Sequence, residues 1–214
     1  MSYAVKEIYF TLQGEGVNTG RAAVFLRFAG CNLWSGRDAD RSRGSAACAA
    51  WCDTDFTGTD GPGGGRFADA VALARAVAQT WPPASSAPRL VVCTGGEPLL
   101  QLDGPLVDAL HAERFTVAIE TNGTRTPPPG VDWICVSPKA GAELVLTRGD
   151  ELKLIFPQPG AEPERFASLE FRHFLLQPLD DSAREENTRR AVEYCLEHPE
   201  WRLSLQTHKR LGLR

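Results

Sequence analysis

The stretch Leu90-Val91-Val92-Cys93-Thr94-Gly95-Gly96-Glu97 sets the pattern of the chain, with four apolar residues in a row and then a polar turn. A short apolar run without alternation is typical of a strand that is covered on both faces in a parallel sheet. Further strand-like runs lie at residues 24–28, 116–119, 133–136, 152–156, 174–176 and 202–205. Helical periodicity is found in only three segments, at about 67–81, 105–113 and 182–197. We therefore predict an α/β fold, a partial (β/α) barrel of about six parallel strands with few crossover helices.

Composition bounds the class of protein. The chain has 214 residues, of which 43% are hydrophobic and 23% charged, and this suits one globular domain over residues 1–214 with a loop insertion at about 32–50. The net charge of −4 argues against a protein that grips nucleic-acid backbone over a broad face. No apolar run approaches the roughly 20 residues of a membrane span, and the first ten residues do not resemble a secretory signal. We therefore expect a cytoplasmic protein with no nucleic-acid or membrane partner.

Polar motifs follow the predicted strands, always at the carboxyl end. These motifs begin at Cys31, Thr94, Glu120, Ser137, Gln177 and Gln206. In barrels and open α/β sheets, active sites are assembled from the loops at this end of the strands. Six motifs that converge on one rim make an enzyme the leading hypothesis, although a Gly-Gly pair alone is also typical of a plain turn.

The six cysteines fall into two groups, and disulfides are not expected in a reducing compartment. The first group lies in apolar strands or on the inner face of a helix, as small buried hydrophobes do: Cys93, Cys135 and Cys195. The second group lies in or beside a polar loop: Cys31, Cys48 and Cys52. Zinc usually takes four ligands, whereas three thiolates without a fourth suit an iron–sulfur cluster with one open iron. A chance trio is the alternative at this point.

Several motifs, taken as a set, resemble one enzyme family. They lie at residues 9–16 (YFTLQGEG), 28–34 (FAGCNLW), 52–56 (CDTDF), 94–98 (TGGEP), 120–123 (ETNG) and 137–139 (SPK). The set is similar to the 7-carboxy-7-deazaguanine synthase family of the radical S-adenosylmethionine (SAM) superfamily, from about Ala4 to the C-terminus. In that superfamily, three cysteines hold a 4Fe–4S cluster and a Gly-Gly-Glu loop meets the methionyl amine.

The resemblance implies a reaction and its partners. Members of the family convert 6-carboxy-5,6,7,8-tetrahydropterin to 7-carboxy-7-deazaguanine with release of ammonia, on the route to queuosine and related 7-deazapurines. They use a 4Fe–4S cluster, SAM and Mg²⁺, and an electron delivered to SAM yields the 5′-deoxyadenosyl radical that starts the rearrangement. The resemblance also implies a homodimer and an external reductant such as a flavodoxin or ferredoxin.

The resemblance further implies roles for individual residues. The implied cluster ligands are Cys31, Cys48 and Cys52, and the implied Mg²⁺ ligand is Thr54. The positions that match SAM-binding positions are Trp51, Cys52, Asp53, Gly96, Ser137, Pro138, Lys139, Gln177, Pro178, Leu179 and Asp180. The positions that match substrate-binding positions are Leu12, Gln13, Gly14, Arg27, Thr94 and, through its terminal carboxylate, Arg214. Arg27 would offer the pterin carboxylate a planar fork, which a lysine cannot provide.

The cysteine spacing departs from the usual superfamily pattern, C-x3-C-x2-C. Sixteen residues separate Cys31 from Cys48, and three separate Cys48 from Cys52. The extra residue in the second gap changes the turn that presents both thiolates. Two alternative functions follow from weaker subsets of these motifs. One is a radical SAM activating enzyme that acts on a glycyl-radical protein, and the other is a non-catalytic zinc-binding module with Cys48 and Cys52 as a structural pair.

Overall fold

The computed structural model describes residues 2–213 and, over that range, contains a nine-stranded sheet in the order β3-β1-β2-β4-β5-β6-β7-β8-β9. The strands are β1 (Tyr3–Leu12), β2 (Ala22–Phe28), β3 (Gly65–Phe67), β4 (Arg89–Gly95), β5 (Phe115–Thr121), β6 (Trp133–Val136), β7 (Arg148–Phe156), β8 (Glu170–Pro178) and β9 (Trp201–Leu203). From β2 to β9 each neighbouring pair in the sheet is parallel, whereas β1 is antiparallel to both β2 and β3.

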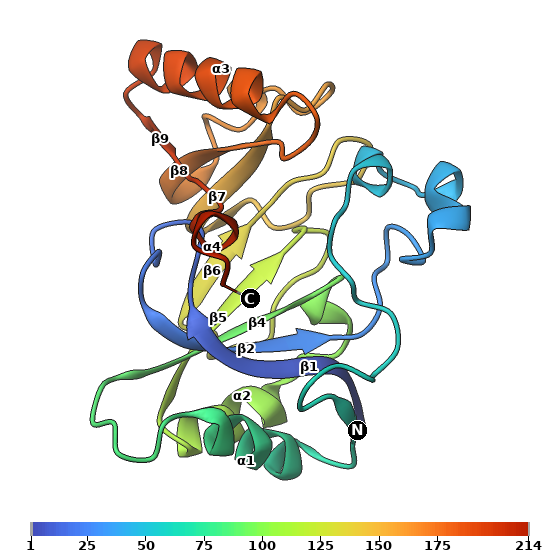
Figure 1. The fold of residues 1–214 in the computed structure, drawn as a ribbon, viewed down its shortest axis with the longest axis vertical. Helices are drawn as coiled ribbons and strands as arrows, with labels where there is room; N and C mark the ends of the chain where they lie inside the picture. The colour runs from blue at the N-terminus through green and yellow to red at the C-terminus, as the bar shows by residue number, and fades with distance from the viewer. Residues whose placement is uncertain (1, 214) are drawn as a thin grey trace.

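Few helices connect these strands (Figure 1). The α-helices of the described chain are α1 (Ala70–Thr80), α2 (Gly104–Ala112), α3 (Arg184–Glu197) and α4 (Thr207–Leu211). Short 3-10 turns are η1 (Asp38–Arg43), η2 (Ala47–Ala50), η3 (Pro98–Leu100) and η4 (Pro163–Arg165). Within residues 2–213, the crossovers from β5 to β6, β6 to β7 and β7 to β8 contain no α-helix, which confirms the predicted partial barrel with few crossover helices. None of the described helices is both long and apolar enough to span a membrane.

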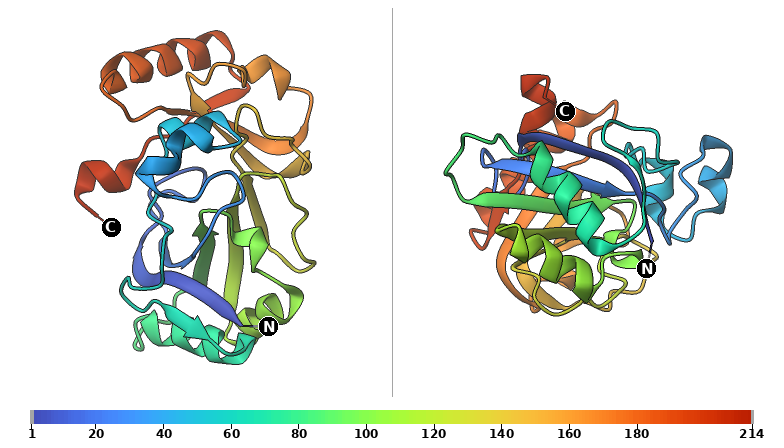
Figure 2. Two further views of the ribbon diagram at one scale, coloured as in Figure 1. Left: turned by 90° about the vertical axis from the view of Figure 1, so that its right-hand side faces the viewer. Right: turned by 90° about the horizontal axis from the view of Figure 1, so that it is seen from below.

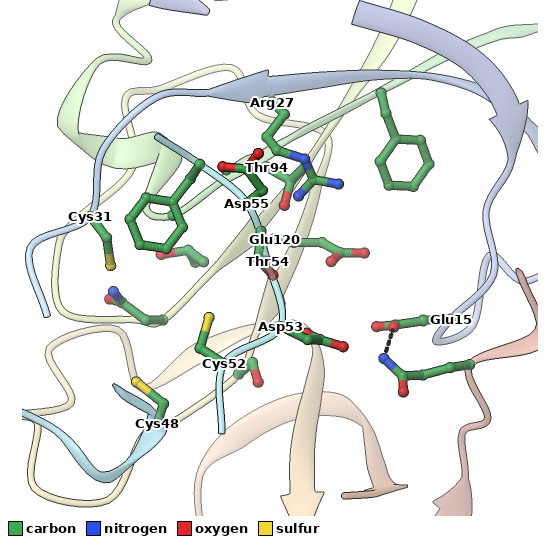
Figure 3. A pocket seen from close by; sticks show the side chains of 18 of the residues that line it. Glu15, Arg27, Cys31, Cys48, Cys52, Asp53, Thr54, Asp55, Thr94 and Glu120 are labelled. Atoms are coloured by element: carbon green, nitrogen blue, oxygen red, sulfur yellow. Dashed lines mark hydrogen bonds between the residues drawn. The ribbon is translucent and has the colours of Figure 1, made fainter. Parts of the chain in front are cut away.

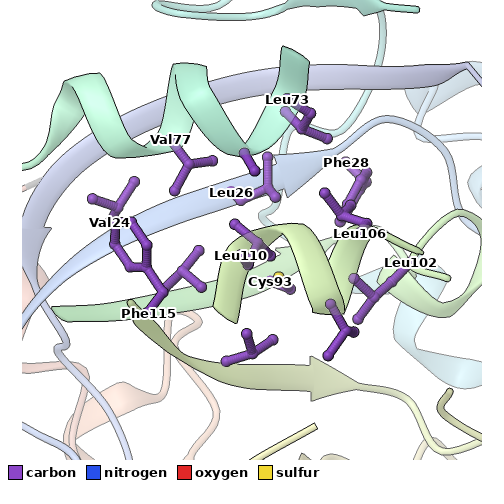
Figure 4. Packing of buried hydrophobic residues seen from close by; sticks show 14 of the residues in the cluster. Val24, Leu26, Phe28, Leu73, Val77, Cys93, Leu102, Leu106, Leu110 and Phe115 are labelled. Atoms are coloured by element: carbon purple, nitrogen blue, oxygen red, sulfur yellow. The ribbon is translucent and has the colours of Figure 1, made fainter. Parts of the chain in front are cut away.

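Helices α1 and α2 pack side by side over one face of β1, β2, β4 and β5 (Figures 2 and 4). Each helix begins at an aspartate whose side chain accepts a backbone N–H of the first turn, Asp69 in α1 and Asp103 in α2. The side chains of this core include Leu73, Val77, Leu106, Leu110, Val24, Leu26, Val91, Cys93 and Val117. Burial of each large aliphatic side chain contributes about 1.5–3 kcal/mol. The strand ends that form the site therefore extend from a rigid core.

A second core lies under α3 at the other end of the sheet, against β7, β8 and β9. Its members include Leu152, Leu154, Leu176, Ala191 and Trp201. The prediction that Cys93 and Cys135 are buried hydrophobes is confirmed. Cys195 differs, since it is half-buried and contacts this second core from its edge.

Strand β1 was not among the predicted strands, because charged residues interrupt its apolar pattern. Lys6 and Glu7 are nevertheless buried, and each has ionic partners. Lys6 pairs with Asp55 and Asp60, and Glu7 pairs with Arg27. The pairing of β1 with β2 also shifts register at Lys6, which takes this side chain out of the regular ladder. Ion pairs with other segments thus allow a charged sequence to form an inner strand.

Candidate active site

A cavity of about 440 Å³ lies at the carboxyl end of the parallel strands. Its walls include residues at the ends of β4, β5 and β8 and residues that follow β2, β6 and β9. All six strand-end motifs contribute at least one residue, namely Cys31, Thr94, Glu120, Ser137, Gln177 and Gln206. Figure 3 shows side chains from these separate segments around one space. The cavity therefore occupies the place where barrel enzymes hold their active sites.

The three cysteines of the polar loop line one side of this cavity. Cys31 follows β2, Cys48 lies in η2 and Cys52 comes two residues after the end of that turn. In Figure 3 their sulfur atoms are on one side, and the labelled charged residues Glu15 and Glu120 are on the other. Burial raises the pKa of the Cys31 thiol and raises that of Cys48 to about 11, and a negative charge on the neighbouring thiols acts in the same direction. Binding of a metal would release these protons.

The sulfur donors of the cavity suit a metal cluster better than a single metal ion. Among the described residues, no three His, Cys, Asp or Glu side chains are placed to share one metal ion. In a 4Fe–4S cluster the thiolates bind different irons, so the ligands stand farther apart than around a single ion. All six cysteines of the chain are free thiols. Cys135 also borders the cavity, but it is buried in β6. The three soft sulfur donors of the polar loop, Cys31, Cys48 and Cys52, fit a 4Fe–4S cluster with one iron open.

The turn after β4 is pressed against the turn that precedes Cys31. The backbone N–H of Glu97 donates to the carbonyl of Gly30 at 3.0 Å. A Cβ atom on Gly96 would lie 2.4 Å from that carbonyl oxygen and 2.6 Å from the Cβ of Cys31. Only glycine permits this approach, because any side chain would push the two turns apart. The Gly-Gly pair, which a plain turn could have explained, thus fixes the position of the first cysteine.

The carboxylate of Glu97 does not face the cavity. It is fully buried, and it accepts hydrogen bonds from the backbone N–H groups of Leu99 and Asn122 and from the hydroxyl of Thr121. Burial raises the pKa of Glu97, and these donors partly oppose that shift. Glu97 therefore connects the ends of β4 and β5.

Lys139, after β6, connects two of the predicted SAM-binding loops. Its ammonium donates to the carbonyl oxygen of Ser137 at 2.9 Å and to the hydroxyl of the same residue. It also lies 5.8 Å from the centre of the Trp51 ring, within the range of a cation–π contact. Burial lowers the pKa of Lys139, and the nearby Cys48 opposes that shift.

A buried ionic network lies on the opposite side of the cavity. Lys153 of β7 forms an ion pair with Glu15 and lies 3.5 Å from a carboxylate oxygen of Glu120. The side-chain amides of Gln13 and Gln206 donate to Glu120 and Glu15, at 2.8 and 3.0 Å. Burial disfavours the charged form of Lys153, but the two carboxylates outweigh it and raise its pKa well above the ordinary value. Burial would likewise raise the pKa of Glu15, but Lys153 outweighs it and lowers that pKa.

The sequence analysis assigned Gln13 of this network to the site but not Glu15, Glu120 or Lys153, although signals for them were present. Glu15 and Glu120 stand inside two of the motifs that carry the family resemblance. Lys153 is a single charge within the apolar run 152–156. A charge in a strand that is covered on both faces requires a buried partner, and two acids in neighbouring motifs could supply one.

Arg27 of β2 projects into the cavity from above Thr94, its register partner on β4 (Figure 3). Its Nε donates to a carboxylate oxygen of Glu7 at 2.8 Å, and its Nη2 donates to the Tyr9 hydroxyl at 3.2 Å. These bonds use two of the five N–H donors of a guanidinium group. Arg27 is therefore oriented by β1 while its side chain borders the cavity.

The carboxylates on either side of Thr54 are held by lysines. Lys209 of α4 lies 2.5 Å from a carboxylate oxygen of Asp53, and Lys6 lies 2.9 Å from one of Asp55. Thr54 lines the cavity between them. Lys6, Lys139, Lys153 and Lys209 are all the lysines of the sequence, and every one of them borders this cavity.

Most of the predicted site residues line the cavity. They are Leu12, Gln13, Gly14, Arg27, Cys31, Cys48, Trp51, Cys52, Asp53, Thr54, Thr94, Gly96, Ser137, Lys139 and Gln177. Four others do not line it: Pro138, Pro178, Leu179 and Asp180. Pro178 and Asp180 border a neighbouring pocket, and Lys209 connects Asp180 to Asp53. Arg214 lies outside the described residues, so the role of its carboxylate stays a prediction, as do the individual roles of the other residues.

Three free thiols beside a Gly-Gly-Glu turn, at the carboxyl edge of a partial parallel barrel, define a radical SAM enzyme, with SAM and a 4Fe–4S cluster as its cofactors. Curated relatives named 7-carboxy-7-deazaguanine synthase are 64% identical in Bordetella pertussis and 63% identical in Bradyrhizobium diazoefficiens, over the full length of both chains. The chain belongs to the 7-carboxy-7-deazaguanine synthase family.

The fold agrees with that assignment. The crystal structure of QueE from Escherichia coli superposes with a TM-score of 0.72 at 30% identity and covers 97% of this chain and 95% of its own. A search against models of protein families found no match. The relatives favour the synthase over the two alternatives, an activating enzyme and a zinc-binding module.

Proposed function

We propose that this chain converts 6-carboxy-5,6,7,8-tetrahydropterin to 7-carboxy-7-deazaguanine with release of ammonia. The observation that carries the proposal is the two-sided cavity, with three thiols on one side and a set of paired acids and bases on the other. Full-length relatives at up to 64% identity bear the name of this activity. A substrate held on the charged side would face the cofactors on the sulfur side.

On the sulfur side, Cys31, Cys48 and Cys52 would hold the 4Fe–4S cluster. When bound, the cluster and SAM supply the radical that starts the rearrangement. Gly96 keeps the turn after β4 close to Cys31, so backbone groups of that turn can orient SAM beside the open iron. The predicted SAM positions Trp51 and Lys139 are already in contact. These groups position the reactants and exclude water, which is the protein's share in radical chemistry.

On the charged side, the residues suit a carboxylated pterin. Arg27, oriented by Glu7, would bind the substrate carboxylate through a planar donor group. Glu15 and Glu120 are acceptors that suit the N–H groups of a pterin ring, and Lys153 pairs with both of them. Leu12, Gln13, Gly14 and Thr94 complete this part of the lining.

Magnesium would bind at Thr54. The carboxylates of Asp53 and Asp55 are paired with lysines, so the hydroxyl of Thr54 is the oxygen that this segment offers to the cavity. Mg²⁺ prefers oxygen ligands and keeps several waters. One hydroxyl, substrate oxygens and water would therefore complete its coordination.

The cellular setting follows from the same chemistry. Six free thiols and an iron–sulfur cluster suit the reducing cytoplasm, where we place the enzyme. An external reductant such as a flavodoxin or ferredoxin would supply the electron. The family resemblance supports a homodimer.

The test is an anaerobic assay with reconstituted protein, SAM, Mg²⁺, a reductant and the carboxylated pterin, followed by chromatography. We expect a 7-carboxy-7-deazaguanine peak without net consumption of SAM. Cys31→Ala should abolish the visible absorbance of the cluster and the product peak, whereas Cys195→Ala, a change outside the cavity, should leave both intact. A protein with a full cluster that never forms this product would refute the assignment.

A further inference from the structure

The insertion at residues 32–47 packs against the turn that carries Cys48 and Cys52. It closes on itself, because the backbone N–H of Ser45 donates to the carbonyl of Leu33 at 2.9 Å. The backbone N–H of Ala47 donates to the carbonyl of Ala140, in the loop after β6, at 2.9 Å. The two 3-10 turns η1 and η2 are in contact at the edge of the molecule (Figure 1). The insertion is therefore an ordered wall of the site.

Arg41 of η1 bonds directly to the turn between the two cysteines. Its Nη1 donates to the carbonyl of Ala49 at 2.7 Å, and Nη1 and Nη2 both donate to the carbonyl of Cys52 at 3.2 Å. Its Nε donates to Asp38 at 2.9 Å, and its guanidinium lies 4.8 Å from the centre of the Trp34 ring. All three guanidinium nitrogens of Arg41 therefore donate hydrogen bonds, and the Trp34 ring contacts the face of the group.

The turn depends on donors from outside. Within it, the backbone N–H groups of Trp51 and Cys52 both donate to the carbonyl of Cys48, at 3.1 and 2.7 Å. The carbonyl oxygens of Ala49 and Cys52 accept the hydrogen bonds of the Arg41 guanidinium. Because Ala49 is buried, its carbonyl needs a donor. Gly44 brings the insertion close enough, since a Cβ there would lie 2.3 Å from the Cβ of Ala49.

We propose that Arg41 is a positioning residue for the iron–sulfur cluster. By bonding two carbonyls of the turn, it fixes the wider C-x3-C loop in the shape that presents the thiolates of Cys48 and Cys52 to the cavity. The extra residue between these cysteines, which departs from the usual spacing, is thus matched by an arginine from the insertion. This inference rests on the proposed role of both cysteines as cluster ligands.

The first test uses cluster-free protein and needs no activity. Arg41→Gln and Arg41→Lys remove the fork, and Arg41→Lys retains the charge. Arg43→Gln is the matched control, since the Arg43 side chain is 82% exposed and only reaches Asp40 at 3.5 Å. Thiol alkylation is followed residue by residue with mass spectrometry. We expect Cys48, which is 4% exposed, to react several-fold faster in both Arg41 variants and at the original rate in the control.

The other cysteines report on the fold in the same samples. Cys31 is bonded by the backbone N–H groups of Leu33 and Trp34 and not by the guanidinium of Arg41, so its rate should stay unchanged. Cys93 and Cys135 are buried in strands and should stay protected as long as the barrel is intact. Faster reaction of Cys48 with protection of the two strand cysteines supports the inference. Equal Cys48 rates in the Arg41 variants and in the unsubstituted protein overturn it.

The second test uses the reconstituted protein. We expect iron loss to a chelator to become about tenfold faster in the Arg41 variants, which corresponds to a decrease of about 1.4 kcal/mol in the activation free energy of iron loss. The electron paramagnetic resonance spectrum of the reduced cluster should broaden in these variants. A general loss of stability would lower the amplitude of the signal without a change in its shape. If the unsubstituted protein binds no cluster, the proposed function and this inference both fail. If it binds one and the Arg41 variants match Arg43→Gln in iron loss and line shape, this inference alone fails.

Discussion

Glu97 illustrates why a motif does not reveal what each of its members does. Its motif lies at the edge of the cavity, yet its carboxylate is turned inward and receives two backbone N–H groups and one hydroxyl. A carboxylate can accept all three bonds, because both of its oxygens are acceptors. The role of the Glu97 side chain is therefore to join the ends of β4 and β5.

Glu97→Gln should therefore destabilise the protein without any change in volume. In either orientation of the glutamine amide, its NH₂ group would face the backbone N–H of Leu99 or of Asn122, which donates to the carboxylate in the original protein. A buried donor is then left unpaired. We expect the free energy of unfolding to fall by about 1–3 kcal/mol, measured by urea denaturation of the anaerobic protein. Glu197→Gln, an exposed change at the end of α3, should have almost no effect. Equal stability of both variants would contradict this account.

The site residues that could be predicted from the sequence were those whose type and position together suggest one specific role. Cys31 and Cys52 fall in this group, because thiols beside a polar loop suggest metal binding. Lys153 and Glu15 do not belong to this group, because the sequence does not show which charge an isolated charge pairs with. These two partners are 138 positions apart in the chain. The role of Arg41 could not be predicted for a similar reason, since its bonds to the cysteine turn go to backbone carbonyls, which carry no sequence signature.

At the scale of elements, the apolar runs predicted the parallel strands well because such strands are buried on both faces. Strand β1 was missed because the ion pairs that bury Lys6 and Glu7 form only in the folded chain. The five-residue helix α4 is too short to show a helical period. The contact between the turn after β4 and the turn before Cys31 could not be predicted either, since its distance depends on how two strands are aligned.

Gly96→Ala tests that contact. The added Cβ would meet the carbonyl oxygen of Gly30 and the Cβ of Cys31, so the two turns must separate. We expect iron content after reconstitution to fall severalfold, with a loss of about 1–3 kcal/mol in stability from overpacking. The matched control is Gly104→Ala at the start of α2, where an added Cβ meets nothing within 4 Å. Normal iron content in Gly96→Ala would show that the turns tolerate separation.

At the scale of the whole molecule, the loop between β1 and β2 closes the sheet against its far strands. The backbone N–H of Val17 donates to Glu151 of β7 at 2.8 Å, and that of Gly16 donates to Ser204, just after β9, at 3.0 Å. The ion pair between Glu15 and Lys153 is part of the same closure. Because these contacts join distant parts of the sheet, they also support the shape of the cavity.

The closure should depend on pH. The folded-state pKa of Glu15 is below its ordinary value of 4.5, and that of Lys153 is above its ordinary value of 10.5. The stabilisation by Glu15 is therefore complete above its unfolded pKa and is lost as the pH falls through its lower folded pKa. Glu15→Gln should cost about 2 kcal/mol at neutral pH, somewhat less than breaking an isolated buried pair because Glu120 remains.

Urea denaturation of cluster-free protein, with and without the substitution, checks this expectation. The stability difference between the two proteins should shrink as the pH is lowered below the ordinary pKa of a glutamate. A difference that stays constant from neutral to strongly acidic solution would show that Glu15 contributes nothing through its charge. Glu197→Gln again serves as the control, because that carboxylate is exposed.

The position of every lysine on the cavity wall has a practical consequence for handling this protein. Apart from the amino terminus, primary amines occur only where substrate and cofactors would bind, while the other basic side chains are arginines. Succinimidyl dyes, aldehyde cross-linkers and amine coupling to a sensor chip would therefore react mainly at Lys209, the exposed lysine of the cavity wall, and break its ion pairs with Asp53 and Asp180, while Lys6 and Lys153 are buried. Immobilisation or labelling through a terminal affinity tag avoids that damage.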